Sequence, residues 1–222
     1  MALSTKNIKI SEGKINKAIA PGNTQGMIYD ISLKPGYNPD SYYLVLNIET
    51  APIDDFEGFY LDPKDESKGR HQGQVGRVRS SQYAYETKTL PSGIKVDRDE
   101  NILKAIMTIA KAQGKLDEIN DIEGETIEDY VNSAKSVICN DVFLNFCIAG
   151  KEYTNKEGYI AYDLFLPKFA NKKYAFSEDP ANVITFNEKD HILPEKKKAA
   201  AESVSDFEPQ QTASASNDFN LF

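Results

Sequence analysis

The stretch 26-GMIYDISL-33 indicates the class of fold, because its apolar and polar residues alternate. In an extended chain, one face would carry the apolar set and the other the polar set: Met27, Tyr29, Ile31 and Leu33 against Asp30 and Ser32. Turn-forming residues bound the stretch on both sides, with Pro21-Gly22 before it and Pro35-Gly36 after it. A period of two residues is typical of a strand with one buried face, so we predict a strand over 26–33.

More strands are predicted on both sides of a helical segment. Strands are expected over 42–50 and 56–61, and residues 74–86 form either one long strand or a hairpin that turns at Ser80-Ser81. Helical spacing then runs over 102–110, with Asp97 or Asp99 as the cap and Gly114 as the stop, and a second helix begins at Thr126. Strands resume over 142–149 and 159–166.

The predicted order is therefore three or four strands, a helical insertion and two strands. We expect a mainly β (β-rich α+β) domain over 1–194, and specifically a barrel of the OB-fold type, which carries a helix between strands three and four. A small α+β domain with another strand order is the alternative. No stretch approaches the roughly 20 apolar residues that span a bilayer, so no contact with a membrane is expected.

Composition indicates a cytoplasmic protein. The 222 residues include two cysteines, Cys139 and Cys147, which are too few for a disulfide framework and are expected to be buried thiols. With only His71 and His191 besides, no zinc site is favoured by spacing, and no cofactor is predicted. The formal net charge is −8, which argues against uniform positive coating for nucleic acid.

Acidic charge is concentrated at the C-terminus. Lys198 is the last basic residue, and Glu202, Asp206, Glu208 and Asp218 after it carry half of the net charge. The segment is rich in Ala, Ser and Gln and cannot bury enough apolar surface to offset the entropy of ordering. We therefore predict a disordered acidic tail over 195–222 with a hydrophobic tip.

Basic residues cluster in one stretch. All four arginines lie between positions 70 and 98, and the segment 67–85 holds Lys68, Arg70, Arg77 and Arg79 and no acid. An unbroken strand would place Arg77, Arg79, Tyr83 and Tyr85 on one face. Guanidinium groups can meet phosphates and aromatic rings can stack on bases, so this face is predicted to bind a single strand of nucleic acid. A solvated strand face with packed tyrosines is the alternative.

Other residues extend the predicted interface. Tyr43 and Tyr60 lie on the preceding strands, and a second basic and aromatic stretch over 168–176 follows the last strand. Its predicted contacts are Lys168, Lys172, Lys173 and Tyr174. An equally good interpretation is that Phe169 and Phe176 close the bottom of the core while the lysines are solvated.

A second pattern in the sequence points to an enzyme. Asp54, followed by Glu66-Ser67-Lys68, resembles the carboxylates and lysine of metal-dependent nucleases of the PD-(D/E)xK type. In that family the E-x-K residues lie on an apolar core strand, whereas here they lie in a polar segment. Motifs for a nucleophilic serine or a phosphate-binding loop are absent from the sequence, so we expect a protein that is not an enzyme.

The last six residues, 217-NDFNLF-222, give the most specific indication of function. A polar, acidic tail ending in Phe after an OB-like body resembles the single-stranded DNA-binding proteins of bacteria and their viruses. The resemblance implies sequence-nonspecific binding of single-stranded DNA in replication, recombination or repair, with the tail recruiting partner proteins. It assigns partner binding to Asp218, Phe219, Leu221 and Phe222. A structural or adaptor protein of a phage is the remaining alternative, and oligomerisation is compatible with either.

Overall fold

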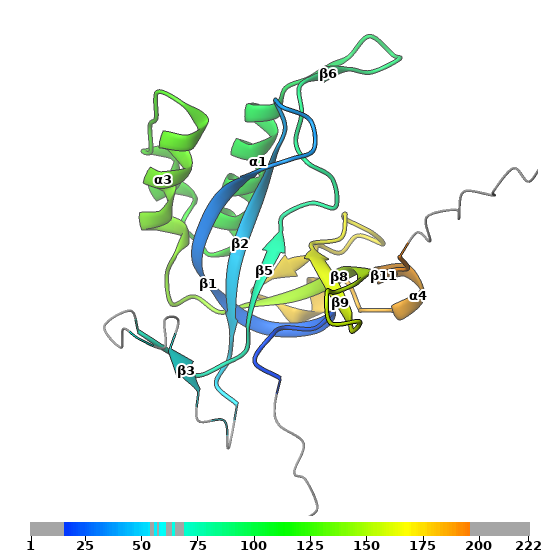
Figure 1. Ribbon diagram of the computed structural model, residues 1–222. Coiled ribbons are helices and arrows are strands. Elements are labelled where there is room, and N and C mark those ends of the chain that lie inside the picture. Colours follow the sequence, from blue (N-terminus) through cyan, green and yellow to red (C-terminus); the bar gives the residue numbers. More distant parts are fainter. Residues whose placement is uncertain (1–15, 54–55, 57, 61–63, 65–68, 196–222) are drawn as a thin grey trace, which may run out of the picture.

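The structure is a computed structural model that describes residues 16–53, 56, 58–60, 64 and 69–195. It is mainly β (Figure 1), and its principal feature is a ring of five strands. These are β1 (Gly22–Pro35), β2 (Tyr42–Thr50), β5 (Val75–Arg79), β8 (Leu144–Thr154) and β9 (Ile160–Phe165). The strands are hydrogen-bonded in the order β1-β2-β5-β9-β8, and β8 pairs with β1 to close the ring.

Strand β1 closes the ring because it is long enough to pair with two neighbours. Its first residues lie antiparallel to β8, from Gly22 opposite Ile148 to Gly26 opposite Leu144. From Gly26 onward it pairs with β2 instead. A Cβ atom on Gly26 would lie 2.6 Å from the carbonyl oxygen of Glu49, so only glycine fits where β1 changes partner.

One prediction for β1 is wrong. We expected Met27, Tyr29, Ile31 and Leu33 to share the buried face, but Ile28 is fully buried together with Ile31. The register with β2 shifts between Ile28 and Asp30, which is a β-bulge. A bulge inserts one residue and reverses the alternation that follows it, so period two does not hold across this strand.

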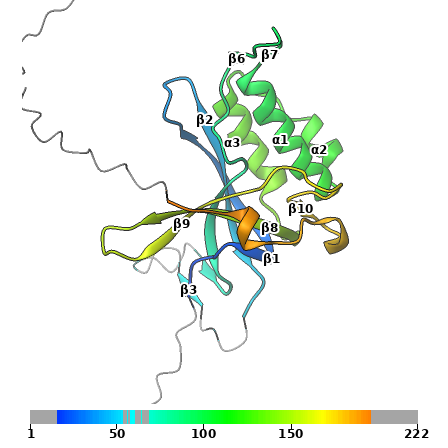
Figure 2. The same cartoon turned by 90° about the vertical axis from the view of Figure 1, so that its right-hand side faces the viewer.

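Three helices lie between β5 and β8 and pack on one side of the sheet (Figure 2). They are α1 (Arg98–Ala112), α2 (Leu116–Asn120) and α3 (Ile127–Ile138). Of the two caps considered for α1, Asp97 is the one used, and its side chain accepts a 3.0 Å hydrogen bond from Glu100 N–H. Thr126 caps α3 in the same way through Asp129 N–H. The helical insertion predicted between the strands is therefore confirmed.

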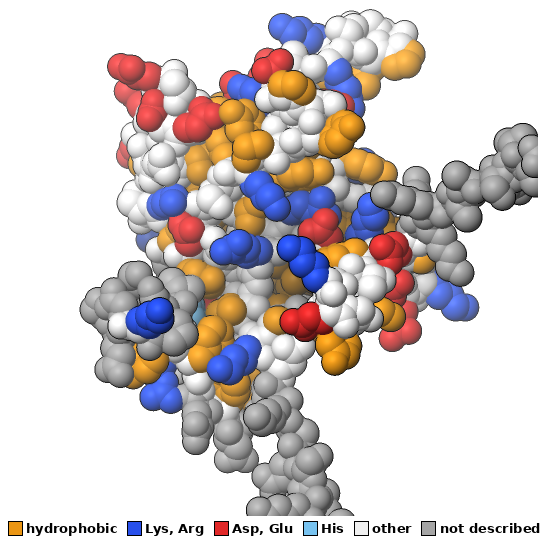
Figure 3. Space-filling view, viewed as in Figure 1, with side chains coloured by type: hydrophobic (Ala, Val, Ile, Leu, Met, Phe, Trp, Pro, Cys, Tyr) orange, Lys and Arg blue, Asp and Glu red, His pale blue; other side chains and the backbone are white. Residues whose placement is uncertain are grey.

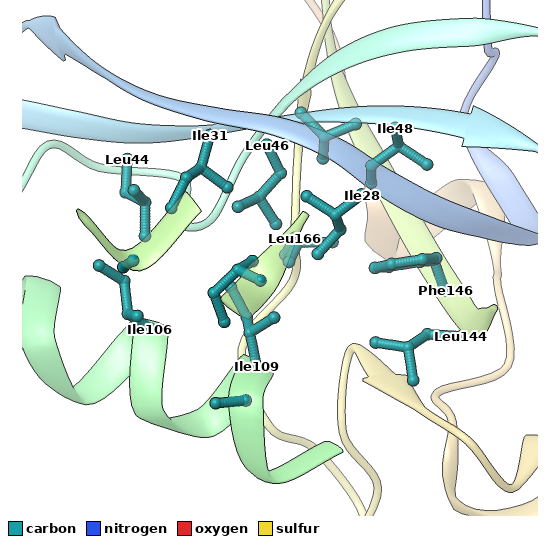
Figure 4. Packing of buried hydrophobic residues seen from close by; sticks show 14 of the residues in the cluster. Ile28, Ile31, Leu44, Leu46, Ile48, Ile106, Ile109, Leu144, Phe146 and Leu166 are labelled. Carbon is teal, nitrogen blue, oxygen red and sulfur yellow. The ribbon is translucent and has the colours of Figure 1, made fainter. Parts of the chain in front are cut away.

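The core lies between these helices and the inner face of the ring (Figure 4). Ile106 and Ile109 of α1 point toward Ile31, Leu44 and Leu46 of the strands. At the other end of the same cluster, Phe146 of β8 lies with its ring 6.1 Å from that of Phe176. Phe176 thus packs against the core, as one interpretation of 168–176 expected, whereas Phe169 is exposed.

Several short elements lie outside the five strands of the ring. Strands β3 (Phe59–Tyr60) and β4 (Arg70–His71) pair with each other, as do β6 (Lys88–Thr89) and β7 (Lys95–Val96). After β9 come β10 (Phe176–Ser177), the 3₁₀ turn η2 (Pro180–Asn182), α4 (Glu188–His191) and β11 (Ile192–Leu193). Strands β10 and β11 both pair with β8. Among the described residues, no helix has the length and apolar content to cross a membrane.

The C-terminal prediction falls almost entirely outside the described residues. Of the tail proposed over 195–222, the structure describes only Glu195. Its carboxylate accepts hydrogen bonds from the backbone N–H and the hydroxyl of Thr154, at 3.1 and 2.8 Å. The chain is therefore attached to the ring up to this residue.

Candidate nucleic-acid interface

Two of the predicted basic residues, Arg77 and Arg79, lie on the outer face of the sheet formed by β2 and β5. Register pairs Val45 with Arg79 and Asn47 with Arg77, while the alternating residues of β2 point into the core. Lys and Arg side chains gather over the middle of this side of the molecule (Figure 3). A protein with a net charge of −8 thus concentrates positive charge on one sheet face.

Arg79 is held between two aromatic rings. Its guanidinium carbon lies 4.9 Å from the ring centroid of Tyr43 and 5.9 Å from that of Phe165. A terminal nitrogen is 3.5 Å from Asp163, whose own side chain is largely exposed, so solvent weakens this ion pair. The Arg79 Nε–H is buried and has no acceptor among the described residues. A buried donor without an acceptor costs free energy that an incoming oxygen atom would recover.

A cleft of about 550 Å³ opens beside this arginine. Its lining combines aromatic, basic and apolar side chains from five parts of the chain: Tyr43, Arg79, Gln82, Tyr83, Lys151, Asp163, Phe165, Leu193 and Pro194. Among the described residues, the charged groups that line the cleft are Arg79, Lys151 and Asp163, a balance that favours an anionic ligand. The cleft thus brings together three of the predicted contacts, Tyr43, Arg79 and Tyr83.

Tyr83 reaches the cleft through a break in the predicted strand. Strand β5 ends at Arg79, and the chain bulges outward over 81–84 before Tyr85 pairs with Tyr42 through two backbone hydrogen bonds. The ring of Tyr83 is left 63% exposed on this bulge. Residues 74–86 are therefore neither one unbroken strand nor a hairpin at Ser80-Ser81.

Tyr85 does not line the cleft. Its hydroxyl is 3.0 Å from that of Ser80, and its ring packs against the core. Burial raises the pKa of the Tyr85 phenol, although the hydrogen bond to Ser80 lowers it. The bulge explains the difference from the predicted shared face, because strand alternation cannot be continued across it.

Arg77 lies one row away from Arg79 on the same sheet face. It is exposed and borders a smaller recess of about 340 Å³ that also includes Asp30, Lys34 and Asn47. The Asp30 carboxylate is partly neutralised, because Lys135 lies 3.0 Å from one oxygen and Asn47 donates to the other. Arg77 thus continues the basic surface along β5.

The remaining predicted residues lie elsewhere or outside the described residues. Arg70 and Tyr60 contact each other on β4 and β3, at 5.8 Å, and neither lines the cleft. Residues 170–173 form a tight turn, and Phe169 and Tyr174 pair at 5.0 Å. This turn borders a separate cavity of about 680 Å³ next to Phe186 and His191. The structure therefore does not bring Lys168, Lys172, Lys173 or Tyr174 to the cleft around Arg79.

The nuclease interpretation rests on residues that the structure does not describe. Asp54, Glu66 and Lys68 all lie outside the described residues, as do Asp218, Phe219, Leu221 and Phe222 of the tail. Within the described ranges, no group of three or more His, Cys, Asp or Glu side chains is arranged to hold a metal ion. The nuclease interpretation and the partner-binding role of the C-terminal tail therefore stay predictions.

In the buried pair of Glu49 and His71, both carboxylate oxygens have hydrogen-bond partners within the protein. His71 Nδ1 lies 2.9 Å from one carboxylate oxygen of Glu49, and the other oxygen accepts from the backbone N–H groups of Gln72 and Gly73. The imidazole is flanked by the rings of Tyr29 and Phe59. These contacts tie β4 to β2, so we assign the pair a structural role.

Sequence reasoning missed Lys151 and Phe165 as cleft residues. Lys151 of β8 lies opposite Asp163 of β9, and Phe165 lies opposite Arg79. The sequence predicted the strands over 142–149 and 159–166, but the contact of β9 with β5 is parallel and links segments about 85 residues apart, which no local pattern reveals. The chain matches no protein-family model, no curated protein and no solved structure in the comparisons made.

Proposed function

We propose that this protein binds single-stranded DNA without sequence preference, in the cleft around Arg79. The observation that carries the proposal is the arrangement of Arg79: its guanidinium lies near two aromatic rings, and its buried Nε–H has no acceptor within the part of the chain that the structure describes. A phosphate or base oxygen would supply that acceptor, and charge-assisted hydrogen bonds from arginine are among the strongest available in water.

A single strand fits these features better than a duplex. The exposed ring of Tyr83 offers a surface for stacking, which requires a base that is not already stacked in a helix. Arg77 lies one row further along the same face and is placed to meet a neighbouring phosphate. Because phosphates and ring faces are common to all nucleotides, such contacts are tolerant of sequence.

We further propose that the ring of strands is an OB-fold. Its order, with helices between the third and fourth ring strands, corresponds to the Greek-key barrel that the sequence favoured. In that fold, oligonucleotides bind the face of strands two and three and the loops that follow strands one and four. Here those strands are β2 and β5, and the two loops present the exposed rings of Tyr37 and Tyr159.

The C-terminal tip retains its proposed role as a partner-binding segment. In this proposal the body binds DNA, and the C-terminal segment with Leu221 and Phe222 recruits replication or repair proteins to the strand. Deleting these two residues should leave DNA affinity intact while capture of such partners is lost. Loss of DNA binding would contradict this division of roles.

Fluorescence anisotropy with labelled poly-dT tests the function itself. We expect tighter binding to poly-dT than to a duplex, and an affinity that falls steeply with salt. Arg79→Gln should weaken binding, whereas Arg98→Gln is a matched control, because Arg98 also lies 4.9 Å from a tyrosine ring and pairs with an aspartate but does not line the cleft. Binding no tighter than to duplex, or insensitivity to salt, would refute the proposal. DNA cleavage with magnesium that is lost in Glu66→Ala would instead support a nuclease.

A further inference from the structure

Two cavities lie along one face of β8, and the proposed function uses only one of them. Lys151 of this strand lines the cleft around Arg79. Cys147 lies four residues earlier in the same strand and packs against Ile184 and Phe186, which line the cavity of about 680 Å³. Residues four apart in a strand share a face and are separated by about 13 Å. The second cavity is therefore a neighbour of the cleft on the same side of the ring.

The chain between α4 and the end of β11 also connects the two cavities. His191 lines the second cavity, whereas Leu193 and Pro194 line the cleft. Because consecutive Cα atoms are about 3.8 Å apart, the Cα atoms of His191 and Leu193 are separated by at most about 7.6 Å. A ligand that leaves the cleft past Leu193 would therefore meet the second cavity at His191.

A tight turn forms part of the wall of the second cavity, and it holds a lysine in a strained conformation. Ala170 and Lys173 exchange two backbone hydrogen bonds of 3.1 and 2.8 Å, and Asn171 and Lys172 between them have positive φ angles of 51° and 62°. Such turns favour Asn-Gly, since glycine adopts positive φ without strain. Lys172 thus occupies the position that suits glycine, and strained residues of this kind cluster at binding sites.

Cations and exposed rings surround this turn. Phe169 and Tyr174 flank it, their ring centroids lie 5.0 Å apart, and their side chains are 59% and 52% exposed. The stretch 168–176 contains no acid and three lysines, Lys168, Lys172 and Lys173. Among the described residues, none of the three ammonium groups has an ion-pair partner. The carboxylate that lines the cavity, that of Asp190, accepts a 3.1 Å hydrogen bond from a neighbouring asparagine.

We infer that the turn over 170–173 and the two rings beside it form a second subsite for the same single strand, which reaches it from the cleft past Leu193. Lys172 and Lys173 bind phosphates there, and the rings of Phe169 and Tyr174 offer a surface on which a base stacks. This inference rests on the proposed function and extends it by a path for the strand and a set of contacts outside the cleft. Each phosphate that a lysine neutralises releases a counterion, so the contacts are measurable through the salt dependence of binding.

The test compares full-length variants by titration of labelled poly-dT at several salt concentrations. Each phosphate contact contributes about 0.7 to the slope of log K against log salt for a single strand, so K172Q/K173Q should reduce the slope by about 1.4. The variant K172R/K173R keeps the charge and should keep the slope. A control, K104Q/K111Q, removes the same charge from exposed positions of α1, a helix that lines neither cavity, and should also keep it.

A second variant, Lys172→Gly, separates binding from stability. Glycine adopts the φ angle of 62° without strain, so this variant should unfold at a higher temperature than the unmodified protein. It also lacks the ammonium group, so its slope against salt should fall by about 0.7. A lysine that contacts no phosphate would give the gain in melting temperature with an unchanged slope.

The outcomes separate this inference from the proposed function. An unchanged slope in K172Q/K173Q, with a steep slope in the unmodified protein, would overturn the inference and leave the cleft as the binding site. An equal reduction in K104Q/K111Q would also overturn it, because the effect would then belong to total charge. Failure of the unmodified protein to bind poly-dT would overturn the proposed function and the inference with it.

Discussion

Replacing Tyr83 by alanine tests the proposed stacking contact with little risk to the fold. The ring is 63% exposed and lies on the bulge over 81–84, outside the hydrophobic core. Substitutions at such surface positions usually change stability by less than about 0.5 kcal/mol. Stacking of one base on an aromatic ring contributes about 1–3 kcal/mol, so Tyr83→Ala should raise the dissociation constant for poly-dT by about 5-fold to about 150-fold.

Two features of the measurement make this prediction specific. The slope of affinity against salt should be unchanged, because a ring that stacks on a base neutralises no phosphate and releases no counterion. Tyr83→Phe keeps the ring and should bind nearly as well as the unmodified protein, and Met107→Ala should also be neutral because it trims an exposed side chain on α1. Anisotropy titrations and thermal unfolding of all four proteins would decide the matter. Equal affinity of Tyr83→Ala and the unmodified protein would refute the stacking role.

Three further predictions concern stability and reactivity. Phe146→Ala should cost about 3–5 kcal/mol in denaturant titrations, because Phe146 is fully buried, whereas the exposed Phe169→Ala should cost almost nothing. The hydrogen bond from the backbone N–H of Glu100 lowers the pKa of Asp97. This cap therefore stabilises the protein at pH values above the ordinary pKa of aspartate, and the stabilisation is lost in acid. Asp97→Ala should lower the melting temperature at neutral pH but not in strong acid. Burial raises the pKa of the Cys147 thiol to about 11, so a thiol reagent should label it at pH 8 only after unfolding, and stability should fall as the pH rises from about 9 toward 11.

Local patterns were sufficient to predict the main elements of this fold. The strand predicted over 42–50 coincides with β2, and the helix predicted from Thr126 begins at Ile127 because the threonine caps it. Hydrophobic spacing and capping are local properties, so they can be found in one sequence. The short strands β6 and β7 were missed, since two-residue strands leave no periodic pattern, and the β1 bulge was missed because it reverses the pattern that identified the strand.

The candidate site was predicted only in part, for a related reason. Arg79 and Tyr83 were found from the scarcity of arginine and from nearby tyrosines, and the structure does place both at one cleft. Tyr85 was assigned to the same face by an alternation that the bulge interrupts. Lys151 and Phe165 depend on pairing between distant strands, which residue types alone do not specify.

The most direct test of the central claim is to map where a single strand contacts the protein. Photocrosslinking with an oligonucleotide that carries iodouracil, followed by mass spectrometry, reports the aromatic residues in contact with bases. Binding at the cleft predicts crosslinks to Tyr83, Tyr43 or Phe165, all of which line it. Crosslinks confined to Phe169 and Tyr174, which lie at the separate turn, would contradict the account.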